Sequence, residues 1–106
     1  MMTIIEVQCA FPDEQIANHL CSLLITSKLI ACANIVSAKS IYTWSEVLQN
    51  EPECLAFMKT TPMRLEGLLQ KLKSSHPYQL PAILYWECKT TDEYGLWVDA
   101  QTQLIS

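Results

Sequence analysis

Cys9 and His76 are the two side chains whose types suit the binding of a metal ion. Cys9 ends an apolar, β-branched segment just before Pro12-Asp13, and His76 follows a segment with helical periodicity. A thiolate and an imidazole together suit copper or zinc, because both metals accept sulfur and nitrogen ligands. Loops at one end of a sheet can converge, so the two residues are candidate metal ligands. Two ligands alone make an incomplete site, and burial of Cys9 in the core is the alternative.

The segment 76–81, His-Pro-Tyr-Gln-Leu-Pro, joins a predicted helix to a predicted strand. Its two prolines bracket His76 and Tyr78 and restrict the backbone. A rigid loop that presents an imidazole suits a binding site. In the alternative interpretation, His76 caps the preceding helix and Tyr78 packs at an interface.

The pattern of polar residues does not favour catalysis. The chain has two histidines, His19 and His76, and it has no GxSxG, GxGxxG or GxxxxGK[ST] motif. Its acidic residues are dispersed and form no evident carboxylate pair. His19 lies on the polar flank of a predicted helix, where a solvated role is expected. The sequence therefore predicts a protein that is not an enzyme.

Charge and hydrophobicity exclude two classes of partner. The 106 residues include seven basic and eleven acidic side chains, a formal charge of −4, and the basic residues form no dense stripe. Nucleic-acid binding needs such a stripe to neutralise phosphates, so it is not expected. No apolar run approaches the roughly 20 residues that cross a bilayer, so no membrane span is expected. The hydrophobic share of 50% favours a buried subunit interface.

The cysteines indicate the compartment. There are five, an odd number, and none is in CxxC spacing. Reduced thiols in the cytoplasm are the expected state, and the N-terminal segment lacks the charge pattern of a secretory signal. Core packing is expected for four of them: Cys21, Cys32, Cys54 and Cys88.

Periodicity places these residues on a short series of elements within one domain spanning residues 1–106. Strands are predicted at 3–9, 32–36 with 40–44, 54–58 and 82–88, helices at 13–28, 61–72 and from 91 onward, and a turn at 49–52. Strand, helix, strand, strand, helix, strand is the order of the α+β, ferredoxin-like βαββαβ fold, here with a short C-terminal helix. Two helices cover one face of such a sheet, and the other face is expected to meet another subunit.

The hairpin from about residue 32 to 60 is longer than a domain of this size can cover. It is expected to project and to pair with a neighbouring chain by strand addition. Lys59, at the end of an otherwise apolar strand, could hold an anion, pair with a carboxylate or extend into solvent.

Taken together, six runs of residues resemble the CutA family of divalent-cation tolerance proteins. Their order and spacing agree with the family from about residue 3 to 100. The runs are Cys9-Ala10-Phe11-Pro12-Asp13-Glu14, Leu29-Ile30-Ala31-Cys32-Ala33-Asn34-Ile35, Ser40-Ile41-Tyr42-Thr43-Trp44, Glu53 and Leu55 with Lys59-Thr60, His76-Pro77-Tyr78-Gln79-Leu80-Pro81, and Tyr94 with Trp97.

The resemblance implies a homotrimer, with the hairpins pairing around the threefold axis. It also implies binding of divalent metals, Cu2+ above all, without catalysis, and it maps Cys9 and His76 onto the proposed copper ligands. Five further residues would lie near a cleft between subunits: Tyr42, Trp44, Lys59, Tyr78 and Trp97. Two other functions stay open, a PII-like sensor of small molecules at that cleft and a trimeric docking module.

Three positions depart from the family pattern. Glu46 stands where family members usually have glycine after the hairpin tryptophan, and a glycine there would allow a bulge. Gln79 and Ala82 stand where family members often have acidic residues. Loss of those carboxylates removes oxygen ligands near His76, so trimer formation is the firmer expectation and copper binding the less firm one.

Overall fold

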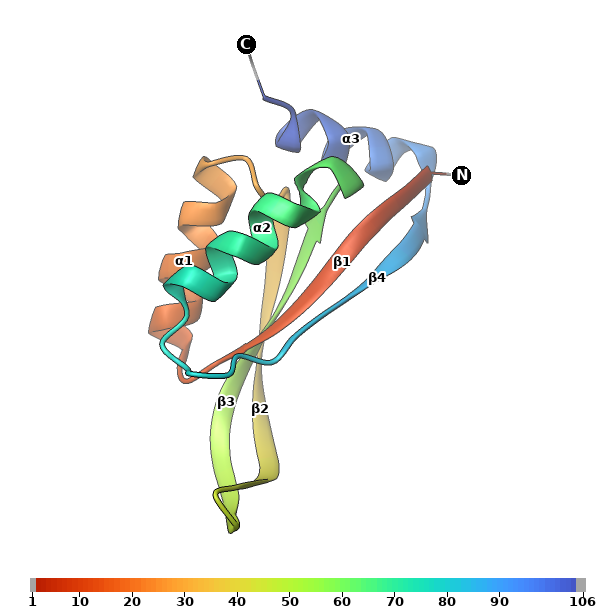
Figure 1. The fold of residues 1–106 in the computed structure, drawn as a ribbon. Coiled ribbons are helices and arrows are strands. Elements are labelled where there is room, and N and C mark those ends of the chain that lie inside the picture. The colour runs from red at the N-terminus through yellow and green to blue at the C-terminus, as the bar shows by residue number, and fades with distance from the viewer. Residues whose placement is uncertain (1, 105–106) are drawn as a thin grey trace.

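The computed structural model describes residues 2–104 and contains one sheet with three helices (Figure 1). Along the chain, the elements are β1 Met2–Phe11, α1 Glu14–Thr26, β2 Cys32–Trp44, β3 Val47–Thr60, α2 Pro62–Ser75, β4 Ile83–Thr90 and α3 Asp92–Thr102. This order confirms the predicted α+β, ferredoxin-like fold with a long β2–β3 hairpin and a C-terminal helix.

The sheet has the strand order β2-β3-β1-β4, and each neighbouring pair is antiparallel. The register places Val7 of β1 opposite Met58 of β3 and Tyr85 of β4. β1 and β3 are therefore the inner strands, and β2 and β4 are the edges. An edge strand presents unpaired backbone groups along one side, so both edges of this sheet can accept a further strand.

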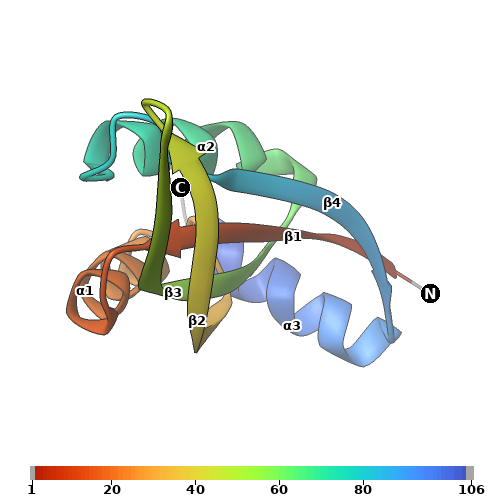
Figure 2. The same ribbon diagram turned by 90° about the horizontal axis from the view of Figure 1, so that it is seen from below.

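Alternation along β1 separates two hydrophobic clusters. Ile5, Val7, Cys9 and Phe11 point to one face, where they pack with Leu20 and Leu24 of α1 and Leu68 and Leu72 of α2. Ile4 points to the other face and packs with Val98 of α3, Ala31 and Cys88. On the second face, α3 lies beside the N-terminal end of β1 (Figure 2).

Gly95 allows this close approach of α3 to the sheet. A Cβ atom at Gly95 would lie 2.7 Å from the Cβ of Met2, a distance that real Cβ atoms essentially never show. Any larger residue at this position would therefore force Met2 or α3 to shift.

The helices begin largely as the sequence predicts. Asp13 caps α1, accepting a hydrogen bond from the Ile16 amide at 2.8 Å, and Thr91 caps α3, accepting from the Tyr94 amide at 3.3 Å. α2 starts at Pro62 as predicted, but the Thr61 side chain makes no capping hydrogen bond. Within residues 2–104, no helix has the length and apolar content to cross a membrane.

The hairpin turn lies at Ser45-Glu46, and the predicted turn at 49–52 is wrong. Residues 49–52 belong to β3, with Pro52 opposite Lys39 of β2. β1 pairs with β3 only as far as Cys54, so between Cys54 and the hairpin turn one edge of β3 is free. A proline nitrogen directed to that free edge removes no sheet hydrogen bond, which is why Pro52 does not end the strand. The outer part of the hairpin consequently projects from the body as a two-stranded ribbon (Figures 1 and 2).

Candidate functional site

Cys9 and His76, far apart in the sequence, meet at the carbonyl oxygen of Ala10. The Nε2 atom of His76 lies 2.7 Å from this oxygen, and the Sγ atom of Cys9 lies 3.9 Å from it. Cys9 is fully buried on the helix-covered face of β1, and His76 is 9% exposed. The carboxyl end of β1 and the loop after α2 therefore bring together the thiol and imidazole that the sequence singled out.

The hydrogen bonds of His76 fix which ring nitrogen carries the proton. A carbonyl oxygen can only accept, so Nε2–H donates to Ala10. The amide of Tyr78 can only donate, and it lies 3.1 Å from Nδ1, which accepts. The ring also stacks on Phe11, with centroids 4.9 Å apart and planes 15° apart. His76 is thus a neutral imidazole with both nitrogens engaged.

Tyr78 connects this loop to the base of the hairpin. Its hydroxyl donates to Oε2 of Glu53 on β3 at 2.7 Å, and its ring lies 4.8 Å from that of His76. Burial and the bond to Glu53 raise the pKa of the Tyr78 phenol above its usual value. The loop 76–81 is therefore held at two points, by β1 through His76 and by β3 through Tyr78.

The Cys9 thiol is protonated in this environment. Burial, helped by the nearby Cys21 and Glu53, raises the pKa of Cys9 from about 9 to about 12. A thiolate, the form that binds metals, is therefore costly at this position. In the described part of the chain, no three His, Cys, Asp or Glu side chains gather in a way that could hold a metal ion. The donors fit copper in kind, while their number in one chain falls short of a complete site.

The five residues expected at the cleft form two groups in one chain. Tyr42 and Trp44 lie on β2 in the hairpin, and Tyr42 is close enough to Tyr78 to contribute to its raised pKa. Lys59 and Trp97 lie at the other end of the sheet, around Cys32 of β2.

Cys32 links the members of that second group. It is opposite Lys59 in the register, and its Sγ lies 3.1 Å from the hydroxyl of Tyr94. The ring of Tyr94 in turn lies 5.7 Å from that of Trp97. The two groups of cleft residues thus lie apart in one chain, one at the hairpin and the other beside α3.

Sequence reasoning missed the polar partners of Lys59 and Tyr78. The Lys59 ammonium lies 2.7 Å from Oδ1 of Asn34 and 3.2 Å from Oε2 of Glu6, within the same chain. Glu53 was recognised only as part of a family run. Glu6 and Lys59 are cross-strand neighbours, and only the strand register shows this.

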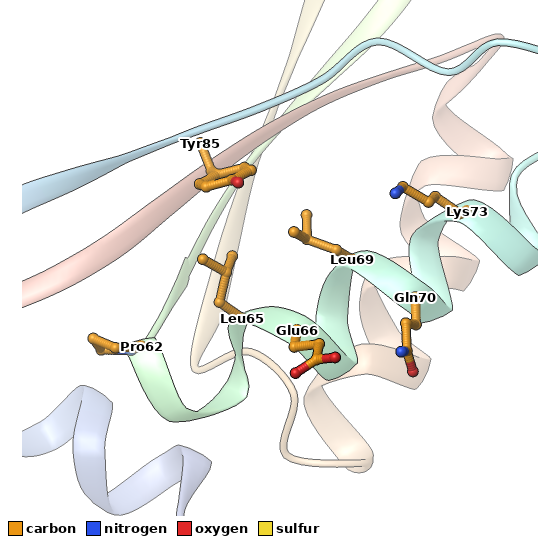
Figure 3. Close-up of a pocket in the computed structure, with 7 residues that line it drawn as sticks. All are labelled: Pro62, Leu65, Glu66, Leu69, Gln70, Lys73 and Tyr85. Atoms are coloured by element: carbon orange, nitrogen blue, oxygen red, sulfur yellow. The ribbon is translucent and has the colours of Figure 1, made fainter.

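Two shallow grooves lie beside the helices, and neither is lined by Cys9 or His76. One, of about 440 Å³, runs between α2 and β4, where Leu65 and Leu69 point toward Tyr85 (Figure 3). The other lies between α1 and the end of α2 and includes His19, which is exposed as expected. Gln79 and Ala82 are also exposed, so the missing carboxylates would have stood on the surface of the His76 loop.

Comparison with known proteins finds one family whose members match this chain over most of its length. Residues 5–101 match the family described as CutA1 divalent ion tolerance protein. The divalent-cation tolerance protein CutA of Escherichia coli O45:K1 is 38% identical over 100 residues, which cover 92% of this chain and 89% of that protein.

Solved structures agree with this match over nearly the whole chain. CutA1 of Ehrlichia chaffeensis has a TM-score of 0.92 with 33% identity, covering 98% of this chain and 99% of its own. CutA1 of Pyrococcus horikoshii has a TM-score of 0.91 with 30% identity, covering 94% and 99%. A CutA of Archaeoglobus fulgidus, described as periplasmic, shares the fold at 23% identity, with a TM-score of 0.90.

Both the family description and that of the E. coli relative are of tolerance to divalent ions and name no enzymatic reaction. The prediction that the protein is not an enzyme agrees with the family. The chain belongs to the CutA1 family of divalent ion tolerance proteins.

Proposed function

We propose that this protein contributes to divalent-cation tolerance by binding Cu2+, with Cys9 and His76 as ligands. The observation that supports this is the convergence of the two side chains on one carbonyl, that of Ala10. Copper accepts both sulfur and nitrogen ligands, and the metal is cargo in such a role, so no reaction is needed.

Binding requires specific changes in the two ligands. Cys9 must lose its proton, and since its pKa is about 12, the metal charge must stabilise the thiolate. His76 must release one of its two hydrogen bonds to offer a lone pair. Further ligands must come from water or from a second copy of the chain, because one chain supplies two.

We also propose that the protein is a homotrimer in the cytoplasm. The open edges of β2 and β4 and the projecting hairpin support assembly, and five free cysteines support a reducing compartment. Light scattering at micromolar concentration is expected to give about three times the chain mass of 12.1 kDa. A mass of one chain would contradict the trimer.

Copper titration of four single variants tests the ligands. Cys9→Ala and His76→Ala are each expected to weaken Cu2+ binding at least tenfold, because each removes one of two protein ligands. The matched controls are Cys21→Ala, another buried thiol, and His19→Ala, an exposed histidine. Both controls are expected to bind like the wild type. The proposal fails if Cys9→Ala and His76→Ala bind copper as tightly as the wild type does.

A further inference from the structure

The proposed ligand His76 has no free lone pair in this structure. Nδ1 accepts from the amide of Tyr78, and Nε2 carries the proton that is donated to Ala10. His76 can therefore act as a ligand in only two ways, and each has a consequence for Tyr78.

In the first way, Nδ1 offers its lone pair and the Tyr78 amide loses its acceptor. In the second, Nε2 offers a lone pair after its proton has moved to Nδ1 or to solvent. A proton on Nδ1 would face the Tyr78 amide, so two donors would oppose each other. If the proton leaves the ring altogether, the product is an imidazolate, which is costly at neutral pH. For a neutral ring, both ways require the Tyr78 amide to move from His76.

The movement of Tyr78 is opposed at the other end of its side chain. The Tyr78 hydroxyl donates at 2.7 Å to Glu53, which is half-buried on β3 where the hairpin leaves the body. Hydrogen bonds to an ionised carboxylate are about twice as strong as neutral ones. The prolines on both sides of Tyr78, Pro77 and Pro81, limit how far the loop can adjust while this bond persists.

We propose that the Glu53–Tyr78 hydrogen bond is a latch that holds His76 in its metal-free state and so lowers the affinity of the site for copper. Tyr78 and Glu53 are positioning residues, since they act on the metal through His76. The inference rests on the proposed function for its effect on affinity, while the latch itself concerns only residues of this chain.

Three variants and one control test the latch. Tyr78→Phe removes the hydroxyl but keeps the ring beside His76, and Glu53→Ala removes the acceptor. Glu53→Gln keeps an acceptor oxygen without the charge, so it is the conservative variant. Tyr85→Phe removes a hydroxyl on β4, away from the site, and serves as the control. Thermal unfolding of each variant establishes that it is folded.

The first measurement is hydrogen exchange of the Tyr78 amide, by NMR, in metal-free protein. Tyr78→Phe and Glu53→Ala are expected to speed this exchange about tenfold, the equivalent of one lost charge-assisted hydrogen bond, while Glu53→Gln has a smaller effect. The second measurement is titration with Cu2+ ions. Tyr78→Phe and Glu53→Ala are expected to bind about tenfold more tightly than the wild type, and Tyr85→Phe like the wild type.

The outcomes separate the latch from the proposed function. If the amide of residue 78 exchanges as slowly in Tyr78→Phe as in the wild type, the latch is overturned. Faster exchange with equal or weaker copper binding overturns its role in affinity. If neither the wild type nor any variant binds copper, the proposed function fails, and the exchange rates alone then decide whether the latch exists.

Discussion

Individual polar residues are anchored throughout the body of the protein. Thr60 donates to the carbonyl of Leu29 at 2.7 Å, and Arg64 donates to that of Thr102 at 2.7 Å. Within residues 2–104, no buried side-chain nitrogen or oxygen lacks a hydrogen-bond partner. Since a buried polar group without a partner costs about 1–3 kcal/mol, these two bonds help to hold the α1–β2 loop against the end of β3 and the end of α3 against α2.

The two most buried thiols predict how stability depends on pH. Burial raises the pKa of Cys9 from about 9 to about 12 and that of Cys21 to about 11. Below pH 9 both thiols are protonated in the folded and unfolded states, so they add no pH dependence. Between pH 9 and about 11 the unfolded chain loses thiol protons that the folded chain keeps. The free energy of unfolding is therefore expected to fall by up to about 1.4 kcal/mol per pH unit for each thiol.

Urea unfolding at about pH 8, 9, 10 and 10.5 measures this slope, because these values run from below the thiol pKa of the unfolded chain into the range where stability should fall. The double variant Cys9→Ala, Cys21→Ala removes both thiols and is expected to show a shallower decline than the wild type. Replacement of Cys88, which is only partly buried, is the control and is expected to leave the slope unchanged. Equal slopes for the double variant and the wild type would contradict the buried-thiol explanation.

The β2–β3 hairpin is the element in which backbone strain is concentrated. Ser45 and Glu46 have φ values of 51° and 66°, as a two-residue turn with a primed geometry requires. Residues other than glycine, asparagine and aspartate rarely adopt this region, at a cost of about 1–2 kcal/mol. The hairpin forms because thirteen residue pairs join β2 to β3 and offset this cost.

Glu46→Gly is expected to stabilise the protein by about 1 kcal/mol, because glycine adopts a positive φ without strain. The same substitution at Glu51, in extended conformation on β3, is the control. It is expected to destabilise the protein by roughly 0.5–1 kcal/mol, since glycine weakens a strand. Chemical denaturation of both variants at one protein concentration measures the two signs. A loss of stability in Glu46→Gly would show that the turn is not strained.

Most of the helices and strands can be predicted from local sequence patterns, but the position of the hairpin turn cannot. Asp13 and Thr91 start helices through their own side chains, so a few neighbouring residues suffice to predict them. The turn could not be placed in this way, because Pro52 and Asn50 are typical turn residues while Ser45 and Glu46 are not. Its position depends on the register along the whole ribbon, which is a property of two strands.

The candidate site was predictable only in part for the same reason. Cys9 and His76 are uncommon residue types at the ends of predicted elements, so they could be selected from the sequence. Their partners were not, since the carbonyl of Ala10 and the carboxylate of Glu53 reach the site through sheet pairing. Lys59 illustrates the same limit, as its pairing with Glu6 depends on the β1–β3 register.

The molecule as a whole leaves much apolar surface uncovered, and the hairpin carries a large part of it. Ile41 and Leu48 are 64% and 72% exposed, and by alternation they point to one face of the ribbon. Tyr42, Trp44 and Val47 are also exposed, on or beside the other face. Large apolar side chains are thus exposed on both faces of the ribbon, so we expect that neighbouring chains cover them in the proposed trimer.

A single charge on the hairpin is therefore expected to disrupt assembly. Ile41→Lys places an ammonium on a side chain that the trimer would bury, and a buried unpaired charge is strongly unfavourable. Met63→Lys is the matched control, because Met63 is 85% exposed at the start of α2, away from the ribbon. Light scattering at micromolar concentration should give a smaller mass for Ile41→Lys and the wild-type mass for Met63→Lys. If Ile41→Lys kept the full trimer mass, the hairpin would not be the element that joins the subunits.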